Sequence, residues 1–246
     1  MPRLEYKYFM PLSQLNDLRR DVTPYLNYDF FAEKMQTKEY TVRSIYLDSQ
    51  QLLTYHEKSD GVKRRHKYRI RGYNLPEENS LVFLEIKGKN IDYISKDRIP
   101  VLYKNLEAFL ETKDLSLIHS VDDALSSIVP GAESFFYYYL LYDLRPKVIV
   151  TYEREAYECK FGSGLRITFD KNIRTRETDN YTDLFQEQDM IPSVRDYFVL
   201  EVKFHKVVPR WVPIIIRKYN LIRGSAPKYS MSIDAAVLQN NFSQLI

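Results

Sequence analysis

Short segments in which apolar and polar residues alternate run along most of the chain and predict a β-rich protein. Alternation with a period of two places one face of a strand against a core and turns the other face away from it. The segments with this pattern are 3–9, 40–48, 53–58, 64–73, 80–89, 92–98, 146–157, 164–172 and 196–205. We therefore expect about eight or nine strands.

Apolar residues at helical spacing predict helices in the gaps between groups of strands. These helices fall in 13–22, 101–112, 122–142, 209–219 and 231–240. In the first of them, Leu15, Leu18 and Val22 form an apolar stripe, and Pro24 follows as a terminator.

The organisation of the chain predicts a single α+β domain over residues 1–246. No repeat at a fixed period and no Gly/Ser-rich linker interrupts the pattern. Many antiparallel strands must protect their edges, either in a two-layer sandwich or by closing into a barrel. The pattern alone does not decide between these two arrangements.

The composition excludes several classes of protein. With 44% apolar residues, the chain can build a large core and is not disordered. The 36 Lys and Arg residues barely outnumber the 33 Asp and Glu residues, so any site for a polyanion must be local. The single cysteine, Cys159, and the four scattered histidines offer no disulfide, no thiolate zinc site and no His pair at helical spacing.

We expect a cytoplasmic protein. A single cysteine is typical of a reducing compartment. The charged start, MPRLEYKYF, does not resemble a signal peptide, and the longest apolar stretch, 135–142, is too short for a membrane span. The sequence does not decide whether a separate membrane protein recruits the chain, and it does not decide the oligomeric state.

Charged residues two positions apart recur on the predicted strands. In HKYRIRGY, Lys67, Arg69 and Arg71 share one face of a strand, because successive side chains point to opposite faces. Other strands repeat this spacing with Glu5 and Lys7, with Glu85, Lys87 and Lys89, with Glu201 and Lys203, with Tyr152 and Arg154, and with Arg166, Thr168 and Asp170.

Two interpretations fit this spacing. On a sheet with one solvent-exposed face, opposite charges would form weak surface pairs. Cations outnumber carboxylates on these faces, however, so an exposed surface would be repulsive. If the charged faces point inward, the cations require a polyanion such as a phosphate-rich ligand. The carboxylates would then hold Mg²⁺ or Mn²⁺, which bridges phosphate oxygens, whereas the alternative for each Glu is an ion pair with its neighbouring Lys.

The basic run from Lys63 to Arg71 resembles a nucleic-acid patch when it is taken alone. Its alternation from Lys67 onward indicates a strand with directed side chains, whereas residues 63–65 are expected in a solvated turn. We assign function only to the alternating part and expect no nucleic-acid partner.

The charged motifs also occur in an order that resembles a known family. The Glu-x-Lys start, the Lys-x-Arg-x-Arg strand, FLEIKGK, TYERE, LRITFD, LEVKF and PKYS follow one another from Leu4 to about Ser232. This set resembles a VTC domain, the polyphosphate-polymerase branch of the triphosphate tunnel metalloenzymes in the CYTH-like superfamily. The resemblance implies a closed antiparallel β-barrel of about eight strands, with surrounding helices and a basic tunnel in its lumen.

The resemblance assigns roles to individual residues of this chain. The catalytic phosphate-binding cations would be Lys7, Arg69, Arg71, Lys87, Arg154 and Lys228. Tyr152 would be a tunnel tyrosine near the nucleotide, and further substrate-binding residues would be Lys67, Arg166 and Lys203. Glu201 would bind the metal ion, with Glu5 and Glu85 as additional metal candidates. Pro227 stands where family members often carry a hydroxyl residue, for which Ser225 or Ser230 would substitute.

The resemblance implies a phosphotransferase that moves the γ-phosphoryl group of ATP onto a polyphosphate chain, with Mn²⁺ or Mg²⁺ as cofactor. Such a reaction needs donor, acceptor and metal held in line, and it needs no covalent nucleophile. The expected ligands are ATP and polyphosphate or tripolyphosphate. The alternatives are a triphosphatase or polyphosphatase on the same fold, a polyphosphate- or nucleotide-binding module without turnover, and a nucleic-acid protein that uses the 63–71 run.

Overall fold

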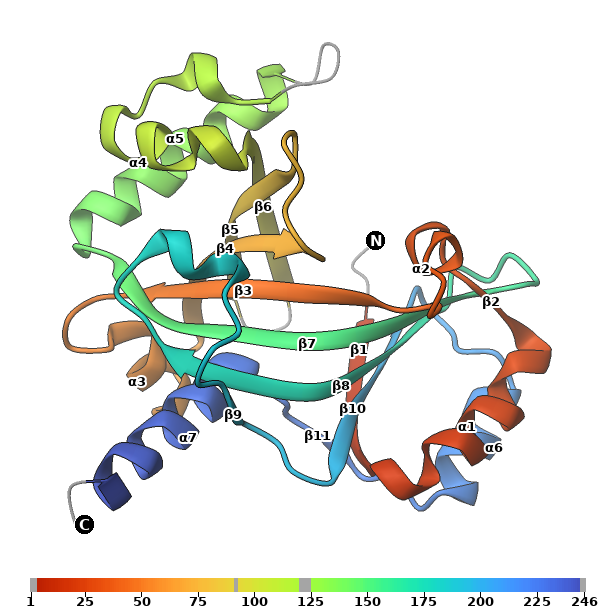
Figure 1. Ribbon diagram of the computed structural model, residues 1–246. Coiled ribbons are helices and arrows are strands. Elements are labelled where there is room, and N and C mark those ends of the chain that lie inside the picture. Colours follow the sequence, from red (N-terminus) through yellow and green to blue (C-terminus); the bar gives the residue numbers. More distant parts are fainter. Residues whose placement is uncertain (1–3, 91–92, 120–124, 244–246) are drawn as a thin grey trace. The chain divides into compact units, whose positions relative to one another are not determined.

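The computed structural model describes residues 4–90, 93–119 and 125–243, which form strands joined by helices (Figure 1). The strands are β1 (Leu4–Pro11), β2 (Leu26–Tyr28), β3 (Tyr40–Asp48), β4 (Arg64–Tyr73), β5 (Leu81–Asn90), β6 (Tyr93–Leu102), β7 (Arg145–Cys159), β8 (Arg166–Glu177), β9 (Ile191–Pro192), β10 (Tyr197–Phe204) and β11 (Arg223–Gly224). The helices are α1 (Leu15–Val22), α2 (Phe30–Lys34), α3 (Leu53–Ser59), α4 (Leu106–Thr112), α5 (Leu125–Leu141), α6 (Trp211–Lys218) and α7 (Lys228–Ser243). Within the described ranges, no helix is both long enough and apolar enough to cross a membrane.

The strands form one 11-stranded sheet that is open rather than closed. The hydrogen-bonded order is β11-β1-β10-β8-β7-β3-β4-β5-β6, with β2 beside β7 and β9 beside β8. No pairing joins β11 to β6 among the described residues. The expected closed barrel is therefore wrong, whereas the α+β class with antiparallel pairing is confirmed. Alternation records which face of a strand is buried, and it does not record whether the first and last strands meet.

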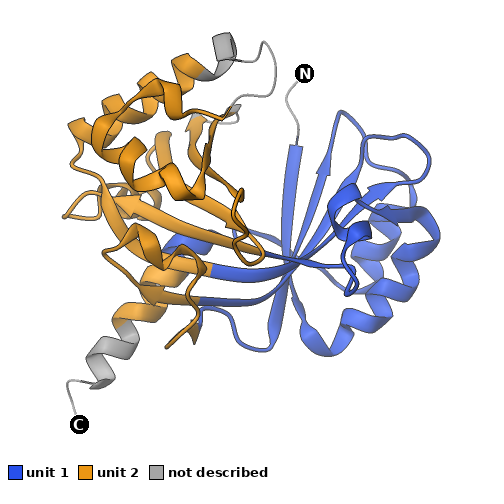
Figure 2. Ribbon diagram, turned by 45° about the horizontal axis from the view of Figure 1, so that its top comes forward, with its two compact units in different colours: residues 1–41, 151–174, 192–231 blue, residues 42–150, 175–191, 232–246 orange. Residues whose placement is uncertain are grey.

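The chain forms two compact units, and each unit has its own hydrophobic core (Figure 2). Unit 1 comprises residues 1–41, 151–174 and 192–231, and unit 2 comprises residues 42–150, 175–191 and 232–246. Strands β3, β7 and β8 contribute residues to both units. The expected single domain over residues 1–246 stays a prediction.

In unit 1, antiparallel pairing places β10 between β1 and β8. Alternate residues of these strands, among them Tyr8, Phe169 and Leu200, pack into the core of this unit together with apolar residues of α1 and α6. The remaining positions of the same strands carry the charged residues. Burial of one face therefore fixes the direction of the charged face, because a shift of one residue would exchange the two faces.

In unit 2, strands β3 to β6 likewise turn the apolar residues of one face into a buried core. Ile45, Ile70, Leu84 and Ile99 lie directly opposite one another on successive strands and are fully or almost fully buried. Helices α4 and α5 contact β6 and contribute Phe109 and other apolar residues to this core. These helices cover the end of the strand path, which protects an edge that would otherwise invite pairing with another chain.

One predicted strand is a helix. The segment 53–58 lies in α3, and Asp48 at the end of β3 caps that helix. The buried carboxylate of Asp48 accepts hydrogen bonds from the backbone amides of Thr54 (2.9 Å) and Tyr55 (3.1 Å) and from the Thr54 hydroxyl (2.8 Å). Backbone amides at a helix N-terminus have no partner within the helix, so a carboxylate that accepts from them stabilises the helix. The alternation inside 53–58 contains no trace of this contact.

The other predicted elements are present with shifted ends. The helix expected at 101–112 begins at Leu106, because Val101 and Leu102 continue β6 and pair with Val82 and Leu81. Residues 3, 92 and 122–124 of the predicted elements lie outside the described residues. The short elements β2, α2, β9 and β11 were not predicted, because periodicity needs a longer segment.

Replacing Asp48 by Ala is expected to lower the free energy of unfolding by about 2 kcal/mol, because the first amides of α3 lose a charged acceptor. Asp48→Asn keeps one acceptor oxygen and should cost less. Urea unfolding measures both variants, with the exposed Asp60→Asn as a control. Equal stability of Asp48→Ala and the parent protein would show that the cap is unnecessary.

Candidate functional site

Charged side chains of unit 1 converge on two buried carboxylates. The strand register places Lys7 of β1 and Thr168 of β8 on either side of Glu201 in β10. Asp170 is two residues beyond Thr168 and so shares its face of the sheet. Only 4% of Glu201 and 0% of Asp170 is exposed to solvent, which means that both carboxylates need partners inside the protein.

Glu201 contacts four cations. Its Oε1 atom lies 3.1 Å from Lys7 Nζ and 3.4 Å from Lys228 Nζ. Its Oε2 atom lies 2.8 Å from Lys203 Nζ and 3.9 Å from Arg154 Nη2. Burial alone would raise the pKa of Glu201, but these four cations hold that pKa well below its usual range. The carboxylate therefore stays ionised at physiological pH.

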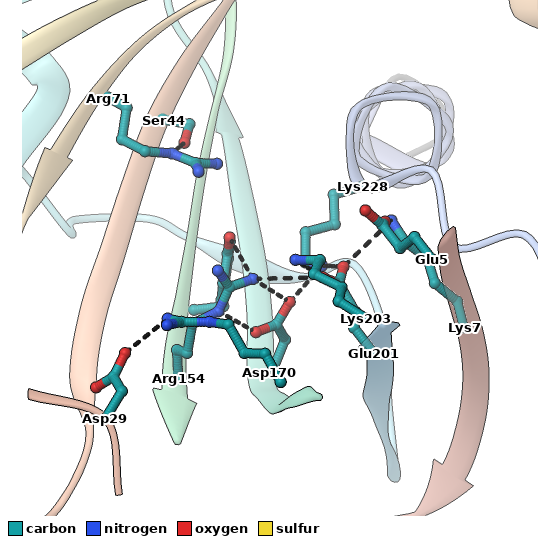
Figure 3. Close-up of polar contacts among 12 residues, drawn as sticks. Glu5, Lys7, Asp29, Ser44, Arg71, Arg154, Asp170, Glu201, Lys203 and Lys228 are labelled. Carbon is teal, nitrogen blue, oxygen red and sulfur yellow. Dashed lines mark hydrogen bonds and ion pairs between the residues drawn. The ribbon is translucent and has the colours of Figure 1, made fainter. Parts of the chain in front are cut away.

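Asp170 binds two of the same cations (Figure 3). Its two oxygens accept hydrogen bonds from Arg154 Nε (2.6 Å) and Arg154 Nη2 (2.8 Å), the bidentate arrangement that suits a guanidinium group. Lys228 Nζ lies 2.6 Å from Asp170 Oδ2. Burial would raise the pKa of Asp170, but Arg154 and Lys228 lower it. Lys228 thus connects Asp170 with Glu201.

The ring of Tyr152 in β7 lies beside Arg154 and Lys228, the two cations that bind Asp170. The ring centroid lies 4.8 Å from Lys228 Nζ and 5.2 Å from the guanidinium carbon of Arg154. Arg154 Nη2 also donates a hydrogen bond to the Tyr152 hydroxyl at 3.3 Å. The face of an aromatic ring attracts cations, so the buried Tyr152 ring orients both of them.

Lys228 begins helix α7 and is buried. Burial would lower the pKa of Lys228, but Asp170 and Glu201 raise it, so the side chain stays a cation. Of the two hydroxyl residues near Pro227, Ser225 is exposed, whereas Ser230 is buried and its hydroxyl has no hydrogen-bond partner within the described part of the chain.

The carboxylates of unit 1 have the donor chemistry that a hard divalent cation requires. Glu5, Asp170 and Glu201 supply only oxygen atoms, which Mg²⁺ and Mn²⁺ prefer. Lys7 Nζ lies 2.9 Å from Glu5 Oε1 and 3.1 Å from Glu201 Oε1, so an ammonium group stands between two carboxylates. In the described ranges, no group of three or more His, Cys, Asp or Glu side chains is arranged to hold a metal ion. A metal ion would therefore have to displace a lysine from these carboxylates.

In unit 2, charged side chains converge on another buried carboxylate, Glu85 of β5. Its direct neighbours across the sheet are Arg69 on β4 and Arg98 on β6. Glu85 Oε2 accepts a hydrogen bond from Arg69 Nε (2.7 Å), and Glu85 Oε1 lies 2.7 Å from Lys96 Nζ and 3.3 Å from Arg98 Nε. Burial would raise the pKa of Glu85, but Arg69, Arg71 and Lys96 lower it far below its usual range.

Strand β3 adds two hydroxyl groups to this second cluster. Ser44 lies opposite Arg71 and Tyr46 lies opposite Arg69. Arg71 Nε donates a hydrogen bond to Ser44 Oγ (3.1 Å), and Arg69 Nη1 donates one to the Tyr46 hydroxyl (3.2 Å). Burial alone would raise the pKa of Tyr46, but Arg69, Arg71 and Lys67 lower it to about 7.

The residues predicted from sequence therefore fall into two clusters. The unit 1 cluster contains Glu5, Lys7, Tyr152, Arg154, Glu201, Lys203 and Lys228. The unit 2 cluster contains Lys67, Arg69, Arg71, Glu85 and Lys87. Arg166 lies in neither cluster and contacts Asp29 at 2.6 Å and Glu158 at 3.1 Å. Burial of the carboxylates argues against a plain solvent-exposed face.

Five residues of the clusters were not assigned from the sequence: Ser44, Tyr46, Lys96, Arg98 and Asp170. Lys96 and Arg98 in ISKDRIP have the spacing of two that identified the other strands, so this signal was available. Asp170 belongs to LRITFD, but the pattern did not reveal that it binds Arg154. Nothing in the segment around Tyr46 indicated its contact with Arg69, because that contact depends on strand pairing.

Replacing Glu85 by Gln is expected to lower the free energy of unfolding by about 3 kcal/mol at pH 7, because buried cations lose their carboxylate. The pKa of Glu85 is lower in the folded than in the unfolded state, so its stabilisation is present above the usual Glu pKa of about 4.5 and is lost below it. Urea unfolding at pH 7 and at lower pH should therefore show a shrinking difference. The exposed Glu111→Gln is the control, and a difference independent of pH would contradict this account.

Replacing Tyr46 by Phe should remove one phenol that ionises with a pKa of about 7. The pKa of Tyr46 is lower in the folded state than the usual value near 10, so its contribution to stability grows as the pH rises above 7. Near-ultraviolet absorbance of the parent protein minus that of Tyr46→Phe measures the titration. A difference that appears only near pH 10 would mean that the neighbouring cations do not act on this phenol.

Solved structures with low sequence identity align with most of the chain. A Pyrococcus horikoshii protein is 14% identical and aligns over 90% of this chain and 92% of its own, with a TM-score of 0.44. A candidate adenylate cyclase from Bacillus halodurans is 9% identical over 92% and 95%, with a TM-score of 0.46. A candidate adenylyl cyclase from Hippeastrum, described as having a dominant triphosphatase activity, is 11% identical over 96% and 97%, with a TM-score of 0.48.

Sequence comparison identifies the family. The vacuolar transporter chaperone complex subunit 4 of Trypanosoma brucei brucei is 24% identical, and the match covers 77% of this chain and 27% of that relative. The matched region is thus about a quarter of the relative's length. The VTC domain matches residues 2–237. Because this match covers nearly the whole chain, the protein belongs to the VTC domain family.

Proposed function

We propose that this chain is a metal-dependent phosphotransferase that moves the γ-phosphoryl group of ATP onto a polyphosphate chain. The observation that carries the proposal is the set of buried or partly buried cations around the buried carboxylates of Glu201 and Asp170, in a chain of the VTC domain family. Lysines and arginines that are partly removed from solvent and share so few carboxylates favour a ligand with several negative charges. The type of reaction is inferred from the resemblance to polyphosphate polymerases.

The contact distances suggest different roles for the cations of unit 1. Arg154 is held on Asp170 by two short hydrogen bonds, so it is a fixed donor that can grip a phosphate with its remaining N–H groups. Lys7 contacts Glu201 at 3.1 Å through a single ammonium group, and this flexible side chain can turn from the carboxylate to the terminal or leaving oxygens, where charge develops during transfer. Lys228 is buried and held at 2.6 Å by Asp170, so it is a positioned cation beside Glu201.

The cations of unit 2 would bind further phosphate groups. Ser44 holds Arg71 and Glu85 holds Arg69, so both guanidinium groups are positioned before any ligand arrives. Positioned donors lower the barrier because the reacting groups need no further ordering. Lys87 lies directly opposite Lys67 on the neighbouring strand and adds a further cation.

Glu201 and Glu5 would hold the divalent ion, Mn²⁺ or Mg²⁺, with Asp170 as a further oxygen donor. When bound, the ion would neutralise charge on phosphate oxygens. Glu85 is a further metal candidate, and there too an ion would have to displace a cation, because Arg69, Lys96 and Arg98 surround it.

We further propose that the protein works in the cytoplasm together with a separate membrane partner. The name of the Trypanosoma relative, a subunit of a vacuolar transporter chaperone complex, supports such a partner. The single cysteine supports a reducing compartment.

The test is incubation of the purified chain with ATP and Mn²⁺, followed by gel separation of the products and an assay for free phosphate. We expect long polyphosphate, and we expect Glu201→Gln to reduce its formation at least about 100-fold, as loss of one charged group at a reacting centre commonly does. Glu33→Gln, in which an exposed carboxylate of the same unit is neutralised, should keep full activity.

The other products decide between the remaining functions. Phosphate released from tripolyphosphate without chain growth would identify a hydrolase and would refute the polymerase. Polyphosphate binding without any product would identify a binding module. Unfolding curves of Glu201→Gln and its binding of polyphosphate show whether this variant has lost only catalysis or has also lost its fold.

A further inference from the structure

The charged face of β4 and β5 extends beyond the residues assigned to catalysis. The sequence suggested a solvated turn for residues 63–65, but β4 begins at Arg64, so Arg65 lies within the strand. Arg65 has the same parity as Lys67, Arg69 and Arg71 and therefore shares their face. Its direct neighbour on β5 is Lys89.

Strand pairing arranges these cations in successive rows. Arg65 faces Lys89 in the outermost row, and Lys67, Lys87 and Lys96 face one another in the next. Like charges directly opposite one another on a sheet are destabilising. In the inner row, Lys96 Nζ also contacts Glu85 Oε1 at 2.7 Å. An anion that lies along the outermost row would offset the repulsion between Arg65 and Lys89, so the register of this row points to a negatively charged ligand.

Local contacts keep the outermost row in place. Arg65 is half-buried, and its Nη1 donates a hydrogen bond to the carbonyl of Val62 at 2.8 Å, which ties the guanidinium group to the preceding turn. On the opposite face of β5, a Cβ atom at Gly88 would lie 2.5 Å from Ser95 Oγ and 3.2 Å from His66, so glycine allows close strand pairing there. Lys89 lies directly opposite Arg65 and is exposed.

The length of this face distinguishes a long ligand from a short one. Arg65, Lys67, Arg69 and Arg71 extend over seven residues of β4, whose first and last Cα atoms are about 20 Å apart at the rise of a strand. A triphosphate that reaches Arg69 and Arg71 is too short to reach Arg65 as well. A linear polyanion can contact every row at once.

The chemistry of the outer rows favours polyphosphate over nucleic acid. Lys67, Lys87, Lys89, Lys96 and Arg65 offer charge without an aromatic ring. Single-stranded nucleic acid gains much of its affinity from bases stacked on aromatic side chains. A chain of bare phosphates needs only the cations.

We propose that Arg65 and Lys89 form a distal subsite that binds the far phosphates of a long polyphosphate chain and thereby favours long chains over tripolyphosphate. This inference rests on the proposed function for the identity of its ligand. It assigns chain-length preference to two residues outside the catalytic set.

The test is calorimetric binding of size-fractionated long-chain polyphosphate and of tripolyphosphate, in EDTA and without ATP, at several salt concentrations. For Arg65→Gln/Lys89→Gln, we expect roughly tenfold weaker binding of the long chain and a salt slope that is shallower by about two, because each lost phosphate contact removes about one. Binding of tripolyphosphate should not change.

The matched control is Lys63→Gln/Arg64→Gln. It removes the same charge from the same hairpin, but Lys63 precedes the strand and Arg64 lies on its opposite face. We expect it to bind the long chain nearly as well as the parent protein. Equal weakening by both double variants would overturn the subsite, because the hairpin would then act only by its total charge.

Other results of the binding assay would overturn the length preference or the choice of ligand. Parallel loss of long-chain and tripolyphosphate binding, or no loss of either, would overturn the length preference. A single-stranded oligonucleotide of equal charge that competes as strongly as polyphosphate would overturn the choice of ligand. The assay needs no turnover, so a subsite can be confirmed in a protein that makes no polyphosphate, and an active polymerase can lack it.

Discussion

Pairing of a few buried carboxylates with the cations that surround them is the interaction on which both clusters depend. Glu201 and Asp170 in unit 1, and Glu85 in unit 2, are almost completely excluded from solvent. Moving an isolated charge out of water costs several kcal/mol or more, and a paired charge recovers this cost only with close contacts. The short contacts of Arg154 with Asp170 and of Arg69 with Glu85 meet that condition. Each unit therefore retains its cations without a ligand.

This neutralisation of the cations is incomplete, so the cations of the clusters can still bind an anionic ligand. Glu201 shares two oxygens among four cations, and the contacts of Lys7 and Lys228 with Glu201 are longer than those of Arg154 with Asp170. A ligand with several negative oxygens can bind such lysines without breaking the stronger arginine pairs. A ligand with one charge gains little, because it cannot compensate for the carboxylate contacts that it replaces. Multiple charge on the ligand is therefore the property that these clusters select.

Strand register decides where each charge lies. Leu200 and Val202 flank Glu201 in sequence and point into the core of unit 1, while Ile70 and Leu84 play this part in unit 2. A slip of one residue would bury the charges and expose the apolar side chains, so the hydrophobic cores hold the cations in place. The rows of cations on β4, β5 and β6 follow from the same rule. The packing of the cores therefore also determines the geometry of the charged clusters.

The sequence by itself determined the strands with strong alternation and the face on which each charge lies, because both depend on a period of two within one segment. It therefore predicted β4 with Lys67, Arg69 and Arg71 on one face, and Glu201 beside Lys203. It did not predict that residues 53–58 are helical, because the cap that starts α3 comes from Asp48 on another element. Nor did it reveal the open strand order, the pairing of Asp170 with Arg154, or the contact of Tyr46 with Arg69. Only the tertiary structure decided these, because each depends on which strands lie side by side and in which register, and residues distant in sequence must meet before such contacts exist.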